Sequence, residues 1–141
     1  MNFVLDASVA LLWLAPETNR AGVEYAVATL MALKESQAVA PSLFALEAAN
    51  VVAKLESRGV VTEADSQRFI ALLGRLNIVT DPATAAHALG DTLNLARRHR
   101  LSAYDAAYLE VALRKGLPLA TLDASLARAA TTAGVPIFGT A

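Results

Sequence analysis

The chain contains no cysteine, and this excludes several kinds of chemistry. With none among its 141 residues, there is no disulfide framework, no thiolate nucleophile and no zinc site built from thiolates. Histidine is almost as scarce, because His87 and His99 are the only two. Their spacing is not that of a zinc-ligand pair, so we expect both to be structural or exposed.

The chain also lacks a long uncharged run and a strong net charge. The longest stretch without Asp, Glu, Lys or Arg is 129–141, which Gly134 and Pro136 interrupt, so no transmembrane helix is expected. The apolar start has no basic n-region and carries Asp6, unlike a secretion signal, and we predict a cytoplasmic protein without membrane contact. A net charge of −1 excludes nucleic-acid binding by bulk charge alone.

The composition, 55% hydrophobic and 18% charged, is that of a folded chain long enough for one domain, which we assign to 1–141. Short apolar runs alternate with segments of helical periodicity. This alternation predicts an α/β fold in which helices flank both faces of a parallel sheet, an α/β/α sandwich. The expected strands are 1–5, 37–40, 76–79, 117–122 and 136–138, and the expected helices are 7–15, 17–36, 42–58, 62–75, 81–100, 102–116 and 123–134.

Two aspartates directly follow predicted strands. Asp6 follows the first strand, and Asp123 follows the strand before the last helix. Ligands of open α/β sheets bind outside the carboxyl ends of the strands, so both carboxylates lie where a site would form. Each also has an ordinary alternative, because Asp is a favoured N-cap residue for the helix that follows.

Glu47 is harder to explain as a surface residue. Its neighbours three and four positions away on a helix are apolar except for Asn50. An ionised carboxylate buried on such a face is costly unless it is protonated, paired with a base or bound to a cation. A structural ion pair with a distant Arg is the alternative to a site.

Asp105 stands three residues after Ser102, so it has the spacing of a capping box at a helix start. Thr62 and Asp65 show the same spacing without any implied chemistry.

Taken together, however, Asp6, Glu47, Asp105 and Asp123 come from places that a parallel sheet can bring together. Like charges at ~4 Å repel by roughly 4 kcal/mol at an effective dielectric constant near 20, so such a cluster requires cations or protons. All-oxygen ligands favour Mg²⁺ or Mn²⁺, and such an ion suits phosphoryl chemistry.

Four segments of the chain resemble the PIN-domain ribonucleases, and among them the small toxins of the VapC type. They are F-V-L-D-A-S, P-S-L-F-A-L-E-A-A-N, Y-D-A-A-Y-L and L-A-T-L-D, in the family's order and over almost the whole chain. The resemblance assigns the family's four acids to Asp6, Glu47, Asp105 and Asp123, and the accompanying polar residues to Ser8, Asn50 and Thr121.

The resemblance implies a PIN-like fold, a divalent-metal site and endonucleolytic cleavage of RNA. It also implies a homodimer and a small antitoxin protein that covers the site. Asp6, Asp105 and Asp123 would bind Mg²⁺ (or Mn²⁺) directly or through water, and Glu47 would be a ligand or the base that orients the attacking water. Ser8, Asn50 and Thr121 would contact these acids without binding the cation themselves.

Basic and aromatic residues could add contacts to RNA. Arg97, Arg98 and Arg100 could bind phosphates, although basic residues in the last turn of a helix also stabilise its dipole. The aromatic residues Trp13, Tyr104 and Tyr108 could stack on bases, but such residues at helical spacing are usually core.

Other protein classes fit less well. A phosphatase with an aspartate nucleophile needs a second Asp where Ser8 stands, and a receiver domain needs paired early acids and a late Lys. The remaining alternative is a non-catalytic module on a PIN-like scaffold that binds a protein partner or RNA. Such a module would have no physical reason to retain four acids.

Overall fold

The centre of the molecule is a four-stranded parallel sheet with the strand order β3-β2-β1-β4. In the computed structural model, which describes residues 1–139, every strand is short. The two inner strands, β1 and β2, are buried along their whole length, whereas β3 lies at an edge and is largely exposed. The bounds are β1 Phe3–Leu5, β2 Ala38–Ala40, β3 Ile78–Thr80 and β4 Leu119–Ala120.

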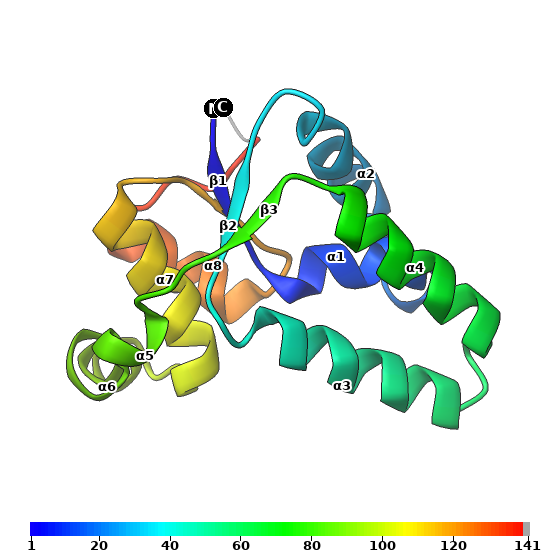
Figure 1. The fold of residues 1–141 in the computed structure, drawn as a ribbon. Coiled ribbons are helices and arrows are strands. Elements are labelled where there is room, and N and C mark those ends of the chain that lie inside the picture. Colours follow the sequence, from blue (N-terminus) through cyan, green and yellow to red (C-terminus); the bar gives the residue numbers. More distant parts are fainter. Residues whose placement is uncertain (140–141) are drawn as a thin grey trace.

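Helices cover both faces of this sheet, which confirms the predicted fold class. In Figure 1, α1 to α4 lie to one side of the sheet and α5 to α8 lie to the other. The helices are α1 Ala7–Leu14, α2 Val23–Ala32, α3 Phe44–Ser57, α4 Glu63–Arg75, α5 Thr84–His87, α6 Leu93–His99, α7 Ala103–Lys115 and α8 Ala124–Thr132. None of the helices found in residues 1–139 combines the length and apolar character needed to cross a membrane.

Several element boundaries differ from those predicted. The expected helix 17–36 begins only at Val23, after two 3₁₀ turns, because its apolar periodicity starts there and the residues just before Gly22 are exposed. The strand expected at 117–122 is reduced to β4. The one expected at 136–138 is a single bridge between Leu119 and Ile137.

The helix expected at 81–100 is divided into three parts. Between α5 and α6 the chain forms a π-helical turn over Ala88–Thr92, a wider winding that interrupts the regular pattern of α-helical hydrogen bonds. Gly90, a poor helix former, lies within this turn. The helix pair therefore bends at a position that the apolar pattern did not predict.

The helix ends show which sequence signals were reliable. Thr62 and Asp65 form the complete predicted capping box, and α4 ends at the predicted Arg75. The helix expected from Ser42, in contrast, begins only at Phe44 and has no side-chain cap. The backbone N–H of Ser42 instead donates to the hydroxyl of Thr84 at 3.0 Å, so its role is a tertiary contact.

Candidate metal centre

The four predicted acids line one pocket at the carboxyl ends of the central strands. The pocket has a volume of about 220 Å³. Asp6 follows β1, Glu47 lies in the first turn of α3, Asp105 lies in the first turn of α7, and Asp123 precedes α8. Ser8 and Asn50 also line it, so residues distant in sequence meet here.

Asp6 is the most enclosed of the four acids, with 5% of its surface exposed. It occupies the N-cap position of α1 but makes no side-chain capping bond, so the capping alternative is wrong. Its Oδ2 instead accepts hydrogen bonds from Ser8 Oγ at 2.6 Å and from Thr121 Oγ1 at 2.8 Å. Because both donors are neutral, they hold this carboxylate without compensating its negative charge.

The same two hydroxyls join the end of β1 to the end of β4. Ser8 Oγ accepts the backbone N–H of Leu122 at 3.0 Å, and Thr121 Oγ1 accepts the backbone N–H of Asp123 at 3.0 Å. Each hydroxyl thus donates to Asp6 and accepts from the backbone that follows β4. This arrangement fixes Asp6 relative to Asp123.

Glu47 is half-buried and has a single hydrogen-bond donor among residues 1–139. Tyr108 Oη on α7 donates to Glu47 Oε1 at 2.5 Å. None of the ion pairs formed within residues 1–139 includes Glu47, so the alternative of a structural pair with an arginine is wrong. The sequence contained no specific signal for this pairing of a tyrosine with the acid.

Asp105 and Asp123 differ in whether the side-chain carboxylate caps a helix. Ser102 Oγ accepts the backbone N–H of Asp105 at 3.0 Å, but the Asp105 side chain does not complete a capping box. Asp123 does cap α8, since its Oδ1 accepts the N–H of Leu126 at 2.8 Å. The predicted cap at Asp123 is therefore present, while its carboxylate also borders the pocket.

The pKa values of Asp6, Glu47 and Asp105 are raised, first by burial and then by neighbouring carboxylates. Burial raises the pKa of Asp6, and the nearby Asp123 adds to the effect. Burial also raises the pKa of Glu47, with further contributions from Asp6 and Asp105. The pKa of Asp105 is raised by burial and by Asp123 and Asp6. No Lys or Arg of residues 1–139 forms an ion pair with these acids, so their donor set and charge fit a divalent cation.

This electrostatic strain predicts a particular pH dependence in the presence of EDTA. A carboxyl whose folded-state pKa is raised destabilises the fold above that pKa, and the penalty disappears as the pH falls towards the ordinary value of 3.8. Asp6→Asn should therefore stabilise the metal-free protein near neutral pH, and this gain should shrink as the pH falls. Urea unfolding between about pH 7 and about pH 4 measures it, and a gain independent of pH would contradict the prediction.

The three arginines expected to contact RNA do not line the acidic pocket. Arg97 Nη1 donates to Asn94 Oδ1 at 3.3 Å, and Arg98 borders a different cavity of about 570 Å³. Arg100 follows α6 in a left-handed conformation, with φ 56°. All three belong to the end of α6, so any contact with RNA would lie beyond the pocket itself.

The cavity beside Arg98 contains a buried ionic network that sequence reasoning missed. Arg114 Nη2 lies 2.6 Å from Asp81 Oδ2, and Arg114 Nε lies 2.8 Å from Glu110 Oε2. Among residues 1–139, His87, Asp91 and Glu110 form the one acid and histidine group whose possible ligand atoms lie within 4.8 Å of one another. Because the Arg114 guanidinium already binds both carboxylate oxygens of Glu110, we interpret this group as structural.

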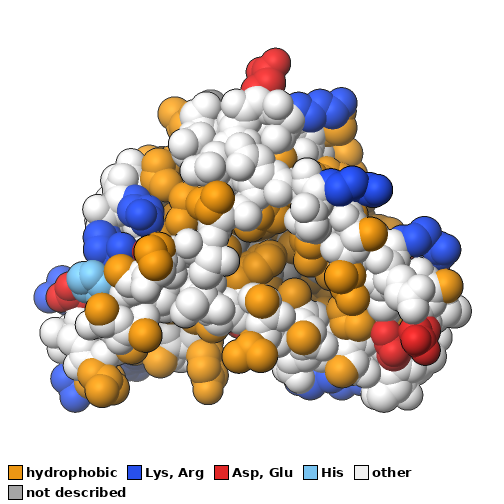
Figure 2. Space-filling model, in the orientation of Figure 1, with side chains coloured by type: hydrophobic (Ala, Val, Ile, Leu, Met, Phe, Trp, Pro, Cys, Tyr) orange, Lys and Arg blue, Asp and Glu red, His pale blue; other side chains and the backbone are white. Residues whose placement is uncertain are grey.

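A third cavity, of about 550 Å³, is an apolar groove between α3 and α4. Phe44, Val52, Phe69 and Ile70 contribute to its walls. Figure 2 shows apolar side chains gathered over this part of the molecule. Glu56 is the one charged residue of its lining, so this groove has no cluster of titratable groups like that of the acidic pocket.

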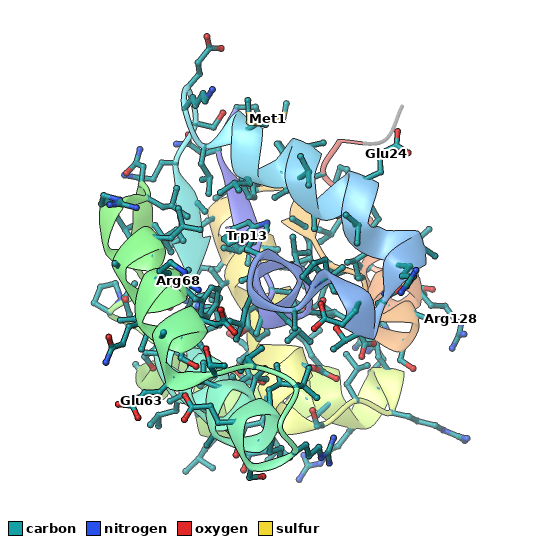
Figure 3. All side chains as sticks on the ribbon, turned by 90° about the vertical axis from the view of Figure 1, so that its right-hand side faces the viewer. Met1, Trp13, Glu24, Glu63, Arg68 and Arg128 are labelled. Atoms are coloured by element: carbon teal, nitrogen blue, oxygen red, sulfur yellow. The ribbon has the colours of Figure 1, made fainter. Side chains whose placement is uncertain are left out.

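The aromatic residues considered for base stacking have different environments. Tyr108 is fully buried and Tyr104 is 66% exposed. Trp13, labelled on α1 in Figure 3, donates from Nε1 to the carbonyl oxygen of Ala26 at 2.8 Å. Trp13 and Tyr108 therefore contribute to packing, which leaves Tyr104 as the accessible ring of the three.

Known proteins share this fold and sequence over most of the chain. A model of the PIN domain matches residues 3–131. Ribonuclease VapC3 of Pyrobaculum aerophilum is 32% identical over 127 residues, which covers 90% of this chain and 93% of that protein. A crystal structure of PAE2754 from Pyrobaculum aerophilum has a TM-score of 0.62 and 26% identity, covering 92% of this chain and 79% of that one. These similarities confirm the resemblance seen in the four motifs: the chain belongs to the PIN-domain family and is a homologue of the VapC-type proteins.

Proposed function

We propose that this protein is a divalent-metal-dependent endoribonuclease that hydrolyses RNA phosphodiester bonds, and that it is the toxin of a toxin–antitoxin pair. The observation that carries the proposal is the acidic pocket, which four carboxylates line without a basic partner among residues 1–139. The similarity to a protein named Ribonuclease VapC3 supports the same activity.

The donor set favours Mg²⁺ or Mn²⁺ as the cofactor. All four charged groups are carboxylates, which suit hard divalent cations, and the pocket of about 220 Å³ leaves room for water molecules beside an ion. A bound cation of this kind would polarise the scissile phosphate and lower the pKa of a water molecule.

The acids that line the pocket would have different roles in the reaction. Asp6, Asp105 and Asp123 would hold the cation, with Asp6 fixed by Ser8 and Thr121. Glu47 would either bind the cation or orient the attacking water and accept its proton. The raised pKa of Glu47 suits the second role, because a general base works best when its pKa lies near the working pH.

The proposed partners are RNA, a cognate antitoxin and a second copy of the chain. An antitoxin would inactivate the toxin by covering the acidic pocket. Arg97, Arg98 and Arg100 would contact phosphates of RNA on their way to the pocket. We expect the protein to act in the cytoplasm as a homodimer, with 1–141 as a single PIN-like domain.

Removal of the cation provides a direct test of the proposed chemistry. The purified protein should cleave RNA in the presence of Mg²⁺ or Mn²⁺, lose the activity in EDTA, and regain it when either ion is restored. Gel analysis of a labelled RNA measures this. Cleavage that persists unchanged in EDTA would contradict the proposed use of a metal.

Expression of the chain alone in a bacterium separates the toxin from a non-catalytic module. We expect the unaltered chain to stop growth and Glu47→Gln to permit it, at equal protein levels on an immunoblot. Equal growth with both chains would favour a PIN-like module that only binds a partner. Growth arrest by both chains would show that toxicity does not depend on the carboxylate of Glu47.

A further inference from the structure

Glu47 is held across the pocket by a residue from another helix. Glu47 lies on α3 and Tyr108 on α7, which lie to opposite sides of the sheet in Figure 1. Tyr108 is fully buried, and its hydroxyl donates to Glu47 Oε1 at 2.5 Å. A buried tyrosine thus directs its one polar atom to an acid that lines the pocket.

Glu47 has a longer side chain to hold in place than the three aspartates of the pocket. A glutamate has a long side chain whose ordering costs up to about 2 kcal/mol in lost rotamer freedom. Asp6 is shorter and receives two hydroxyl donors, and Asp123 is tied to the start of α8. The Glu47 carboxylate has Tyr108 as its one hydrogen-bond donor among residues 1–139.

The chemical nature of the donor matters for binding a cation. A phenol is neutral at ordinary pH and donates a single hydrogen bond, whereas Arg or Lys would neutralise the carboxylate. Tyr108 occupies Oε1 of Glu47 and leaves the negative charge of the carboxylate available to the pocket. Tyr108 also lies three residues after Asp105, so one face of α7 carries both an acid of the pocket and the group that holds another.

We propose that Tyr108 is a positioning residue whose hydroxyl holds Glu47 in the orientation that binds the divalent cation, without itself touching the cation or RNA. This inference rests on the proposed function of the acidic pocket. It assigns to the second tyrosine of Y-D-A-A-Y-L a role separate from packing.

Mn²⁺ binding to the full-length protein tests this role. Tyr108→Phe removes the hydroxyl and retains the buried ring, and we expect it to weaken Mn²⁺ binding about ten-fold, as loss of a residue that orients a metal ligand typically does. Thr29→Val is the matched control, because it also removes a buried hydroxyl that donates one hydrogen bond, from Thr29 Oγ1 to the carbonyl oxygen of Tyr25 at 2.9 Å, and Thr29 does not line the pocket. It should leave Mn²⁺ affinity unchanged. Isothermal titration calorimetry measures all three proteins.

A second comparison separates positioning from a general disturbance of the fold. If Tyr108 acts through Glu47, Tyr108→Phe should have no further effect on Mn²⁺ affinity in a Glu47→Gln background. Equal losses in both backgrounds would overturn the inference, as would unchanged affinity in Tyr108→Phe alone.

Measuring RNA cleavage by the same proteins separates a failure of this inference from a failure of the proposed function. If the Mn²⁺ affinities are as predicted but the unaltered chain cleaves no RNA, Tyr108 is supported as a positioning residue and the proposed ribonuclease activity is overturned. Normal cleavage with equal Mn²⁺ affinity of the unaltered chain and Tyr108→Phe would overturn the inference alone. An unaltered chain that binds no Mn²⁺ would overturn both.

Discussion

Asp6→Asn is expected to reduce RNA cleavage by at least about 100-fold, which corresponds to about 3 kcal/mol of lost transition-state stabilisation. The substitution retains the size of the side chain and one carbonyl oxygen, which can still accept from Ser8 and Thr121. It removes the negative charge of the most buried acid of the pocket. The loss should therefore arise from weaker cation binding and not from unfolding. Initial cleavage rates of a labelled RNA, measured for both proteins at one Mg²⁺ concentration that does not saturate the unaltered chain, measure the effect.

Glu24→Gln is the matched control for Asp6→Asn. It makes the same change from acid to amide at an exposed position on α2, where Glu24 projects outward (Figure 3). The control should cleave RNA at the rate of the unaltered chain. If Asp6→Asn retained a rate within about two-fold of that control, the activity would not come from the acidic pocket.

Arg114→Met is expected to destabilise the fold by about 2 to 4 kcal/mol, because it leaves two carboxylates buried without their cation. Asp81 and Glu110 are 1% and 3% exposed, and Arg114 contacts both. We place the effect below the largest values known for broken buried pairs, since the Arg114 side chain is itself 24% exposed. Urea unfolding near neutral pH measures the loss.

The acids themselves provide the control for Arg114→Met. Combining it with Asp81→Asn and Glu110→Gln removes the unpaired charges and should restore much of the lost stability. A triple variant as unstable as Arg114→Met alone would show that lost packing, not buried charge, causes the effect. Hydrogen bonds from Arg114 lower the pKa of Asp81 to about 2, so the stability that Asp81 contributes is present above its ordinary pKa of 3.8 and is lost as the pH falls towards about 2.

The parts of the fold that local signals control were predictable from the sequence. The Thr62 and Asp65 capping box sets the start of α4, and Ser102 sets the start of α7. The alternation of short apolar runs with helical segments predicted the parallel sheet, because continuous apolar runs are typical of strands that are buried on both faces. The short β4 and the π-helical turn at Ala88–Thr92 were not predicted, because strand pairing and helix packing, not local pattern, determine them.

The acids of the pocket and the two hydroxyls that hold Asp6 could be predicted from the sequence, whereas the partner of Glu47 could not. Glu47 was singled out because a carboxylate amid apolar neighbours requires an explanation, and the structure places it in the pocket with Asp6. Its hydrogen bond to Tyr108 joins residues that are 61 positions apart, so no spacing rule could reveal it. The pairing of Asp81 with Arg114, 33 positions apart, was hidden for the same reason, and Asp81 instead resembled an ordinary helix start.

The hydroxyl of Thr121 and the carboxylate of Asp6 meet across 115 positions of sequence. A chain still emerging from the ribosome has β1 and Asp6 long before it has β4, Thr121 and Asp123. Until those last residues are made, Asp6 lacks one of its two donors and the pocket lacks one of its acids. The acidic pocket is thus among the last parts of the molecule to be completed, so an unfinished chain would lack the full set of carboxylates with which we propose that it binds a cation.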